Sequence, residues 1–107
     1  MSAFADYREH VGVDLDRFFK TTLFQTERLL LGLDCLEPGQ AQVAHRHAGR
    51  DKFYYVIAGQ GDFTIGDEQR SVGVGGVVWA GADVVHGVAN AGAERLIMLV
   101  GIAPEPR

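Results

Sequence analysis

The chain has 107 residues, which corresponds to one domain at about 150 residues per domain. Its composition, 47% hydrophobic and 22% charged, is typical of a globular protein and excludes a disordered chain. The formal net charge of −4 and the absence of a Lys/Arg cluster argue against nucleic acid as a partner. No apolar run approaches the roughly 20 residues that a transmembrane helix needs, so no membrane partner is expected. The single cysteine, Cys35, excludes an internal disulfide and a Cys-based zinc site.

Residues 2–17 form the one stretch with a helical pattern. Phe4, Tyr7, Val11 and Leu15 follow each other at spacings of three and four, which predicts a loose amphipathic helix or an irregular arm. The first ten residues contain no signal-peptide hydrophobic region, so a cytoplasmic location is expected. We therefore assign residues 1–20 to an N-terminal arm and residues 21–107 to the folded domain.

From Phe18 onward, short runs of β-branched, leucine and aromatic residues are separated by turn signals rich in glycine. Their short, even spacing predicts an all-β sandwich or barrel. The clearest hairpin has Gly66-Asp67 as its loop, and glycine at the first position favours a type II′ turn. The expected strands are Phe18–Gln25, Glu27–Leu36, Ala41–Arg46, Lys52–Ala58, Gly61–Ile65, Gln69–Val72, Val77–Ala80, Val84–Ala89 and Arg95–Ile102.

Two of these strands are apolar on both faces. Residues 29–33 and 53–57 show no alternation of polar and apolar side chains. A strand of this kind in a small barrel needs cover on its outer face. Because one small domain has little material for that, we expect a homodimer.

Histidines supply the chemistry that the sequence offers. His45 and His47 are two residues apart in an expected strand, so both side chains point to the same side. Imidazole nitrogen is a common ligand of zinc, copper, iron and nickel, and ligands must converge from one face. His86, in a later strand, is the candidate third ligand. If the strand is regular, Gln42 lies on the opposite face.

The spacing of glycines and histidines resembles the two motifs of the cupin family. The first motif is similar to a pattern in which five residues separate Gly39 from His45, one residue separates His45 from His47, and Gly59 follows. The second motif is similar to a pattern of Gly75, Gly81, His86 and Asn90, which are separated by five, four and three residues. The resemblance covers residues 30–102 and implies a small β-barrel or jelly roll with an internal pocket.

The resemblance also implies a divalent metal in that pocket, held in the family by three histidines and a glutamate. The histidines correspond to His45, His47 and His86, whereas the position of the glutamate is occupied by Lys52. The neighbouring Asp51 is a poor replacement, because a shift of one residue along a strand reverses the face.

The second motif departs from the family pattern as well. Gly81 stands where the family has proline, and Asp83 stands where it has the second glycine. Both changes alter a turn and need not touch chemistry.

Lys52 leaves three alternatives open, because an ammonium group beside a divalent cation is repulsive. In the first case, Lys52 swings away or pairs with a carboxylate, and the three histidines keep the metal, which has open positions for substrate. Alternatively, it stays in the pocket with a depressed pKa. In the third case its charge replaces the metal, and the pocket binds an anion directly.

Two function classes follow. The first is a metal-dependent dioxygenase, isomerase or lyase that uses Zn, Fe, Ni or Cu on a small anionic substrate, with Lys52 or Tyr54 as acid or base. The second is a metal-free, non-catalytic binding or sensor module for a small anion. Tyr54 and Val56 share a strand face with Lys52 and should line the pocket. Other positions are expected to have structural or surface roles: outward-facing Arg46, buried Cys35, surface His10 and turn-fixing Asn90. Trp79 either walls the pocket or packs against a second subunit, and packing is favoured.

Overall fold

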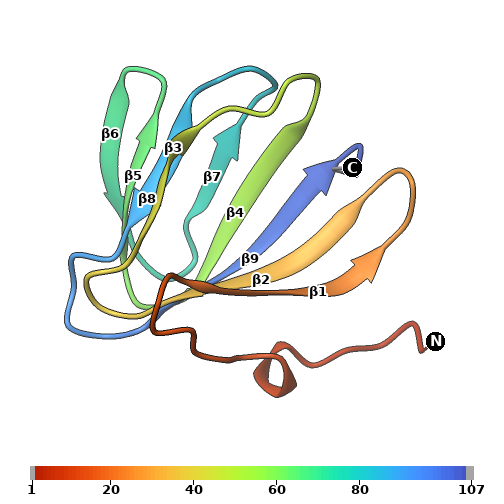
Figure 1. Cartoon of the computed structure of the whole chain (residues 1–107), viewed down its shortest axis with the longest axis horizontal. Coiled ribbons are helices and arrows are strands. Elements are labelled where there is room, and N and C mark those ends of the chain that lie inside the picture. Colours follow the sequence, from red (N-terminus) through yellow and green to blue (C-terminus); the bar gives the residue numbers. More distant parts are fainter. Residues whose placement is uncertain (1, 106–107) are drawn as a thin grey trace.

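A computed structural model describes residues 2–105 of the chain (Figure 1). Every expected strand is present, which confirms the all-β class. The second strand begins three residues late, because the Thr26 N–H donates to the Leu29 carbonyl at 2.9 Å and closes a turn there. Within the described residues the elements are η1 (Tyr7–Glu9), β1 (Phe19–Gln25), β2 (Leu30–Leu36), β3 (Ala41–His45), β4 (Asp51–Ala58), β5 (Gly61–Ile65), β6 (Glu68–Val72), β7 (Val77–Ala80), β8 (His86–Ala89) and β9 (Leu96–Ala103).

The strands form two antiparallel sheets, as the jelly-roll expectation requires. One sheet has the order β1-β2-β9-β4-β7 and the other the order β3-β8-β5-β6. Figure 1 shows the four-stranded sheet on one side and the five-stranded sheet fanning out on the other. The apolar core lies between them and comprises Leu36, Tyr54, Val56, Phe63, Val88, Leu96, Met98 and Val100.

The register places polar side chains among apolar ones on the inner face of the five-stranded sheet. Directly paired residues share a face. One row contains Leu30, Ile102 and Lys52, and the next contains Thr22, Gly32, Val100 and Tyr54. Lys20 pairs with Asp34 in a third row. Lys52, Tyr54 and Val56 therefore share the inner face, as the sequence predicts.

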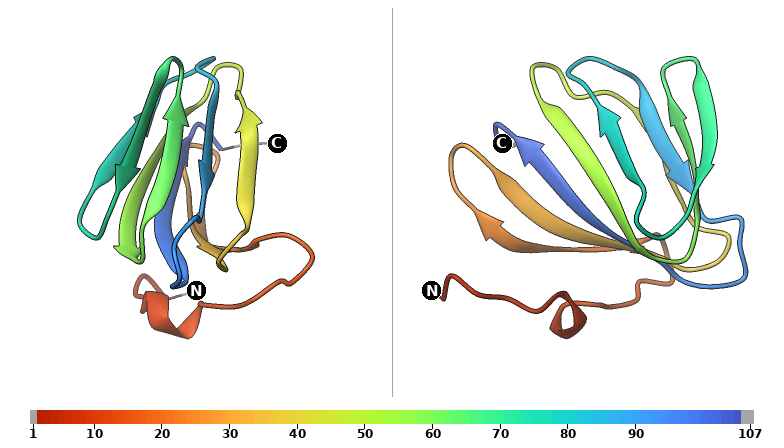
Figure 2. Two further views of the ribbon diagram at one scale, coloured as in Figure 1. Left: turned by 90° about the vertical axis from the view of Figure 1, so that its left-hand side faces the viewer. Right: turned by 180° about the vertical axis from the view of Figure 1, so that it is seen from behind.

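The N-terminal segment is an irregular arm with one short turn, η1, and the helical alternative is wrong. Phe4 and Leu15 are 88% and 86% exposed, so the four spaced residues do not form a buried stripe that would stabilise a helix. The arm is attached through Gln40, whose amide donates to the carbonyls of Asp14, at 2.6 Å, and Arg17. Figure 2 shows it outside both sheets. The first strand begins at Phe19, two residues before the assigned start of the folded domain at residue 21.

The arm supplies part of the outer cover that the two-sided strands need. Gly12 packs so closely on the Phe19 ring that a Cβ there would lie 2.5 Å from it, and Phe19 pairs with Cys35, which is buried on the outer side of β2. By contrast, the outer side of the β4–β7 pair stays open: Trp79 is 61% exposed, and Tyr55 and Val77 beside it are exposed too. The homodimer remains a prediction that concerns this face. In the part of the chain that is described, no helix is long and apolar enough to cross a membrane.

Two turns follow the local sequence closely. Gly66 has a φ of +56° in the two-residue loop between Ile65 and Glu68, and Asp67 is not among the residues with positive φ, which fits a type II′ turn. Asp83 has a φ of +66°, a left-handed conformation that favours glycine. The residue that replaces the family's glycine therefore keeps the glycine conformation.

Candidate metal centre

A β-bulge in β3 sets the direction of the first histidine. Gln42 pairs with Val88 and His45 pairs with His86, so three steps along β3 match two steps along β8. The extra residue is the signature of a bulge. It puts His45 directly opposite His86, on the same face of the four-stranded sheet.

His47 lies beyond the strand rather than on it. β3 ends at His45, so the expectation that both histidines occupy one strand is wrong. A backbone hydrogen bond fixes this loop, because the Asp83 N–H donates to the His47 carbonyl at 3.1 Å. The turn of the second motif thereby positions a histidine of the first motif.

Backbone carbonyls define how two of the rings are protonated. Nδ1 of His45 lies 2.7 Å from the Val43 carbonyl, and Nδ1 of His86 lies 3.0 Å from the Val84 carbonyl. A carbonyl only accepts, so in both rings Nδ1 carries the hydrogen and Nε2 presents a lone pair. Nε2 of His86 is buried and has no hydrogen-bond partner. This is the arrangement that metal-binding histidines adopt, with one nitrogen held by a backbone acceptor.

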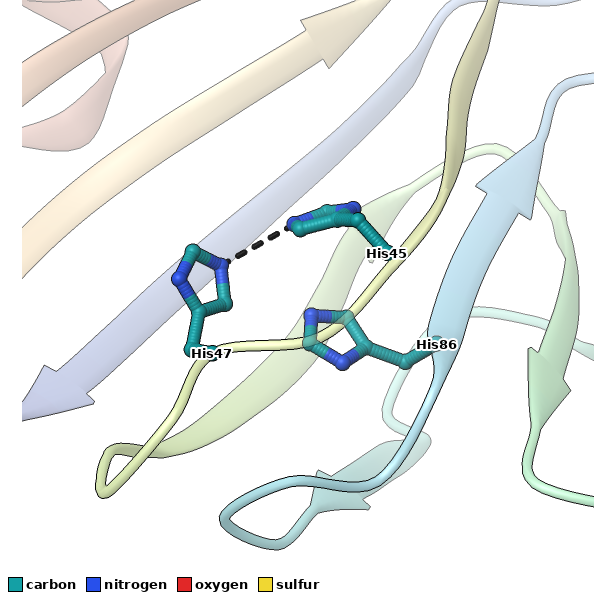
Figure 3. A group of neighbouring side chains, drawn as sticks. All are labelled: His45, His47 and His86. Atoms are coloured by element: carbon teal, nitrogen blue, oxygen red, sulfur yellow. Dashed lines mark hydrogen bonds between the residues drawn. The ribbon is translucent and has the colours of Figure 1, made fainter.

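The three rings converge on one point (Figure 3). The Nε2 atoms of His45 and His47 are 3.0 Å apart, and one nitrogen from each of the three rings lies within 4.8 Å of the others. Tetrahedral zinc with bonds of about 2.0–2.1 Å needs nitrogens about 3.3 Å apart. The separations in the group, 3.0 Å for one pair and no more than 4.8 Å for any, bracket that spacing, so these residues fit a metal ion.

The electrostatics keep these ligands in the neutral form that metals require. Burial lowers the pKa of His47 to about 4, and the nearby Lys52 ammonium group lowers it further. Burial likewise lowers the pKa of His86, against the hydrogen bond to Val84. Both rings are therefore neutral at physiological pH.

Lys52 stays inside the pocket. Its side chain is 4% exposed, and Nζ lies 3.3 Å from the Gln42 side-chain oxygen and 4.6 Å from the centre of the Tyr54 ring. Burial lowers the pKa of Lys52, while the negative charge of Asp34 raises it. Asp51 is engaged elsewhere, because its carboxylate accepts the Ala82 N–H at 2.9 Å.

Sequence reasoning missed two residues of this pocket. The bulge turns Gln42 inward, so its expected place on the face opposite the histidines is wrong. Its oxygen accepts the Tyr54 hydroxyl at 2.5 Å, and its amide lies 3.5 Å from a carboxylate oxygen of Asp34. Asp34 is buried on β2, and the signal for it was available: it is the one charged residue among the apolar residues 29–36.

These groups surround a cavity of about 440 Å³ that adjoins the histidines, a volume suited to a small ligand. Its apolar part comes from the inner face of the five-stranded sheet, and its polar part combines both sheets. The lining residues are Lys20, Thr21, Thr22, Leu30, Gly32, Asp34, Gln42, His45, His47, Lys52, Val100 and Ile102.

The remaining candidates lie outside this chemistry. Asn90 is buried, and its side chain bonds only to backbone groups of Leu36, Gly92 and Glu94. His10 follows the arm's short helical turn, away from the three-histidine group. Tyr54 and Val56 belong to the apolar core and do not line the cavity, so that part of the expectation is wrong. Tyr54 has no exposed surface, and burial raises the pKa of its hydroxyl. Its assignment as acid or base remains a prediction.

Two antiparallel sheets that enclose a three-histidine group define a jelly-roll domain with a candidate metal centre. The Cupin domain family matches residues 32–102, and the chain belongs to this family.

Several relatives extend over most of the chain. The crystal structure of TT1209 from Thermus thermophilus has a TM-score of 0.94 at 35% identity and covers 98% of this chain and 100% of its own. The uncharacterized protein SCO3923 of Streptomyces coelicolor is 31% identical over 83 residues, 77% of this chain and 78% of that protein. KdgF from Halomonas sp. shares the fold at 20% identity, with a TM-score of 0.84 over 99% of this chain and 96% of its own.

Proposed function

We propose that this cupin binds a divalent transition metal through His45, His47 and His86 and acts on a small anionic substrate in the adjoining cavity. The observation that carries the proposal is the Nε2 atom of His86, a buried acceptor with no partner that faces two further imidazoles. A buried polar atom without a partner costs about 1–3 kcal/mol, and a metal ion would remove that cost.

The ligand set selects the metal class. Three neutral nitrogens suit Zn, Fe, Ni or Cu better than Mg or Ca. They leave the charge of the ion uncompensated, and Lys20 and Lys52 add positive charge to the same cavity. An anionic substrate, such as a carboxylate or an enolate, would balance both.

The reaction would be of the dioxygenase, isomerase or lyase type. When bound, the ion would polarise an oxygen of the substrate. Lys52 supports such chemistry because burial lowers its pKa toward the range in which an amine exchanges protons. The apolar wall of Leu30, Val100 and Ile102 would exclude water from the substrate.

A second candidate rests on Lys52 alone. A buried ammonium group where the family has a carboxylate favours a metal-free pocket that binds the anion without turnover.

Elemental analysis of tag-free protein separates the two. We expect about one transition metal per chain, lost in the His45→Ala/His47→Ala double variant and retained in a His10→Ala control. Turnover that disappears in His47→Ala would then assign an enzyme. Protein that purifies without metal and still refuses zinc, iron, nickel and copper on soaking would overturn the metal proposal. In that case, anion binding that is weakened by Lys52→Ala would establish the second candidate.

A further inference from the structure

Three polar side chains on the cavity wall form a chain of contacts that the metal centre does not require. Gln42 stands between Lys52 and Asp34, with its oxygen 3.3 Å from Nζ and its amide nitrogen 3.5 Å from a carboxylate oxygen. The three residues come from β3, β4 and β2, so the fold, not local sequence, brings them together.

The amide of Gln42 defines the charges on its two neighbours. Its oxygen accepts from the Tyr54 hydroxyl and from Lys52, so its NH₂ group faces Asp34. An amide NH₂ donates only, which favours an ionised carboxylate, and an amide oxygen accepts only, which favours an ammonium group. Gln42 therefore holds a carboxylate and an ammonium group apart in one cavity.

Asp34 does not look like a structural carboxylate. A structural pair in this chain is Glu37 with Arg95, two hydrogen bonds of 2.9 and 3.0 Å. Asp34, although buried, has no ion pair within 4.0 Å among the described residues and only the long contact to Gln42. A buried carboxylate that lines a cavity with so few partners is costly for folding, and such groups cluster at functional sites.

We propose that Asp34 is the proton acceptor and Lys52 the proton donor in the enolisation of a small oxo acid, with Gln42 as the positioning residue. The assignment rests on the proposed function, in which the histidines would hold a metal ion that polarises the acid's carbonyl oxygen. Asp34 takes the proton from the carbon next to the carbonyl, and the C–H electron pair becomes the C=C bond. The carbonyl π pair takes a proton from Lys52. The enol leaves Asp34 protonated and Lys52 neutral, and the reverse steps restore both.

The surroundings of the pair suit this role. The charged or titratable groups that face Asp34 are Lys20 on β1 and Lys52 and Tyr54 on β4. Burial raises the pKa of Asp34 and lowers that of Lys52, so both move toward the pH at which proton transfer in either direction is efficient.

The first test measures Asp34 without any substrate. The carboxyl carbon of Asp34 is followed by ¹³C NMR against pH in zinc-loaded wild type, Lys52→Met and Gln42→Met, with Gln69→Met on exposed β6 as the matched control. We expect a midpoint above that of an ordinary aspartate, and a further upward shift in the first two variants only. An ordinary midpoint that none of the variants moves would overturn the assignment.

The second test measures the reaction step. Deuterium uptake next to the carbonyl of a panel of small 2-oxo acids is followed by ¹H NMR in D₂O with the zinc-loaded protein. Asp34→Asn should reduce uptake at least about 100-fold, while Asp62→Asn, an exposed control on β5, should leave it unchanged. No uptake with any acid of the panel, or full uptake by Asp34→Asn, would refute the proposal.

Zinc content measured on the same samples keeps the two proposals distinguishable. Asp34→Asn should retain zinc, because Asp34 is not among the three histidine ligands. A wild type without zinc would defeat the proposed function. A wild type with zinc but without Asp34-dependent exchange would defeat only the assignment of Asp34 and Lys52.

Discussion

Asn90 offers the sharpest test of how the second motif works, because its side chain bonds only to the backbone. The Nδ2 group donates to the Leu36 carbonyl at 2.9 Å and to the Glu94 carbonyl at 2.8 Å, and Oδ1 accepts the Gly92 N–H at 3.0 Å. Asn90→Ala removes all three bonds in a buried place. At about 1 kcal/mol for each bond, and more where a buried group loses its partner, the cost should be about 2–4 kcal/mol.

The measurement is urea denaturation of wild type and Asn90→Ala, with Gln69→Ala as an exposed control. In a domain of this size each kcal/mol shifts Tm by about 4–8 °C, so a parallel thermal scan should show a loss of at least about 8 °C. The metal content of the folded variant should equal that of wild type. A loss of stability below about 0.5 kcal/mol, or a loss of metal at unchanged stability, would refute a purely structural role for Asn90.

Three further outcomes follow from the same structure. Burial raises the pKa of the folded Asp34 carboxyl above the ordinary 3.8, so its contribution to stability is full below pH 3.8 and is lost as pH rises through the folded pKa. The free energy of unfolding of Asp34→Asn should therefore exceed that of wild type by about 0.5–2 kcal/mol at pH 8 and equal it at pH 3.5, as measured by thermal melts. Equal gains at both pH values would contradict the predicted pH dependence. At position 83, where φ is +66°, Asp83→Gly should be about 1 kcal/mol more stable than Asp83→Ala in urea, and equal stability would exclude backbone strain. Sedimentation at micromolar concentration should show a wild-type dimer and a Trp79→Lys monomer, whereas a wild-type monomer would defeat the dimer.

Much of the fold could be predicted from sequence, because strands and turns depend on short-range patterns. The histidine group was predicted from the resemblance to the two cupin motifs. Strands were marked by runs between glycine-rich turns, and Gly66-Asp67 carried its own turn geometry. The two histidine motifs marked three side chains that the structure brings together. The N-terminal segment was ambiguous because its apolar spacing, without a partner surface, does not define a helix.

The polar wall of the pocket could not be predicted in the same way. Gln42 points inward because of one extra residue in β3, and the alternation rule fails wherever a bulge occurs. Asp34 and Lys52 lie in one sheet, on either side of β9, and Gln42 reaches both only because the other sheet packs against that face. A lone carboxylate in an apolar strand marks such a residue, but which groups it meets depends on long-range topology.

Lys52 connects the two halves of this pocket. A cation where the family has a carboxylate raises the electrostatic cost of a metal ion at the histidines, and Lys20 adds to it. Asp34 offsets part of that charge, but its contact through the neutral amide of Gln42 prevents direct neutralisation. A bound anion would offset the rest. Because coupling between two ligands is reciprocal, a metal that favours an anion here must itself bind more tightly when the anion is present. The presence of Lys52 at the position of the family's glutamate therefore favours a site in which substrate and metal stabilise each other.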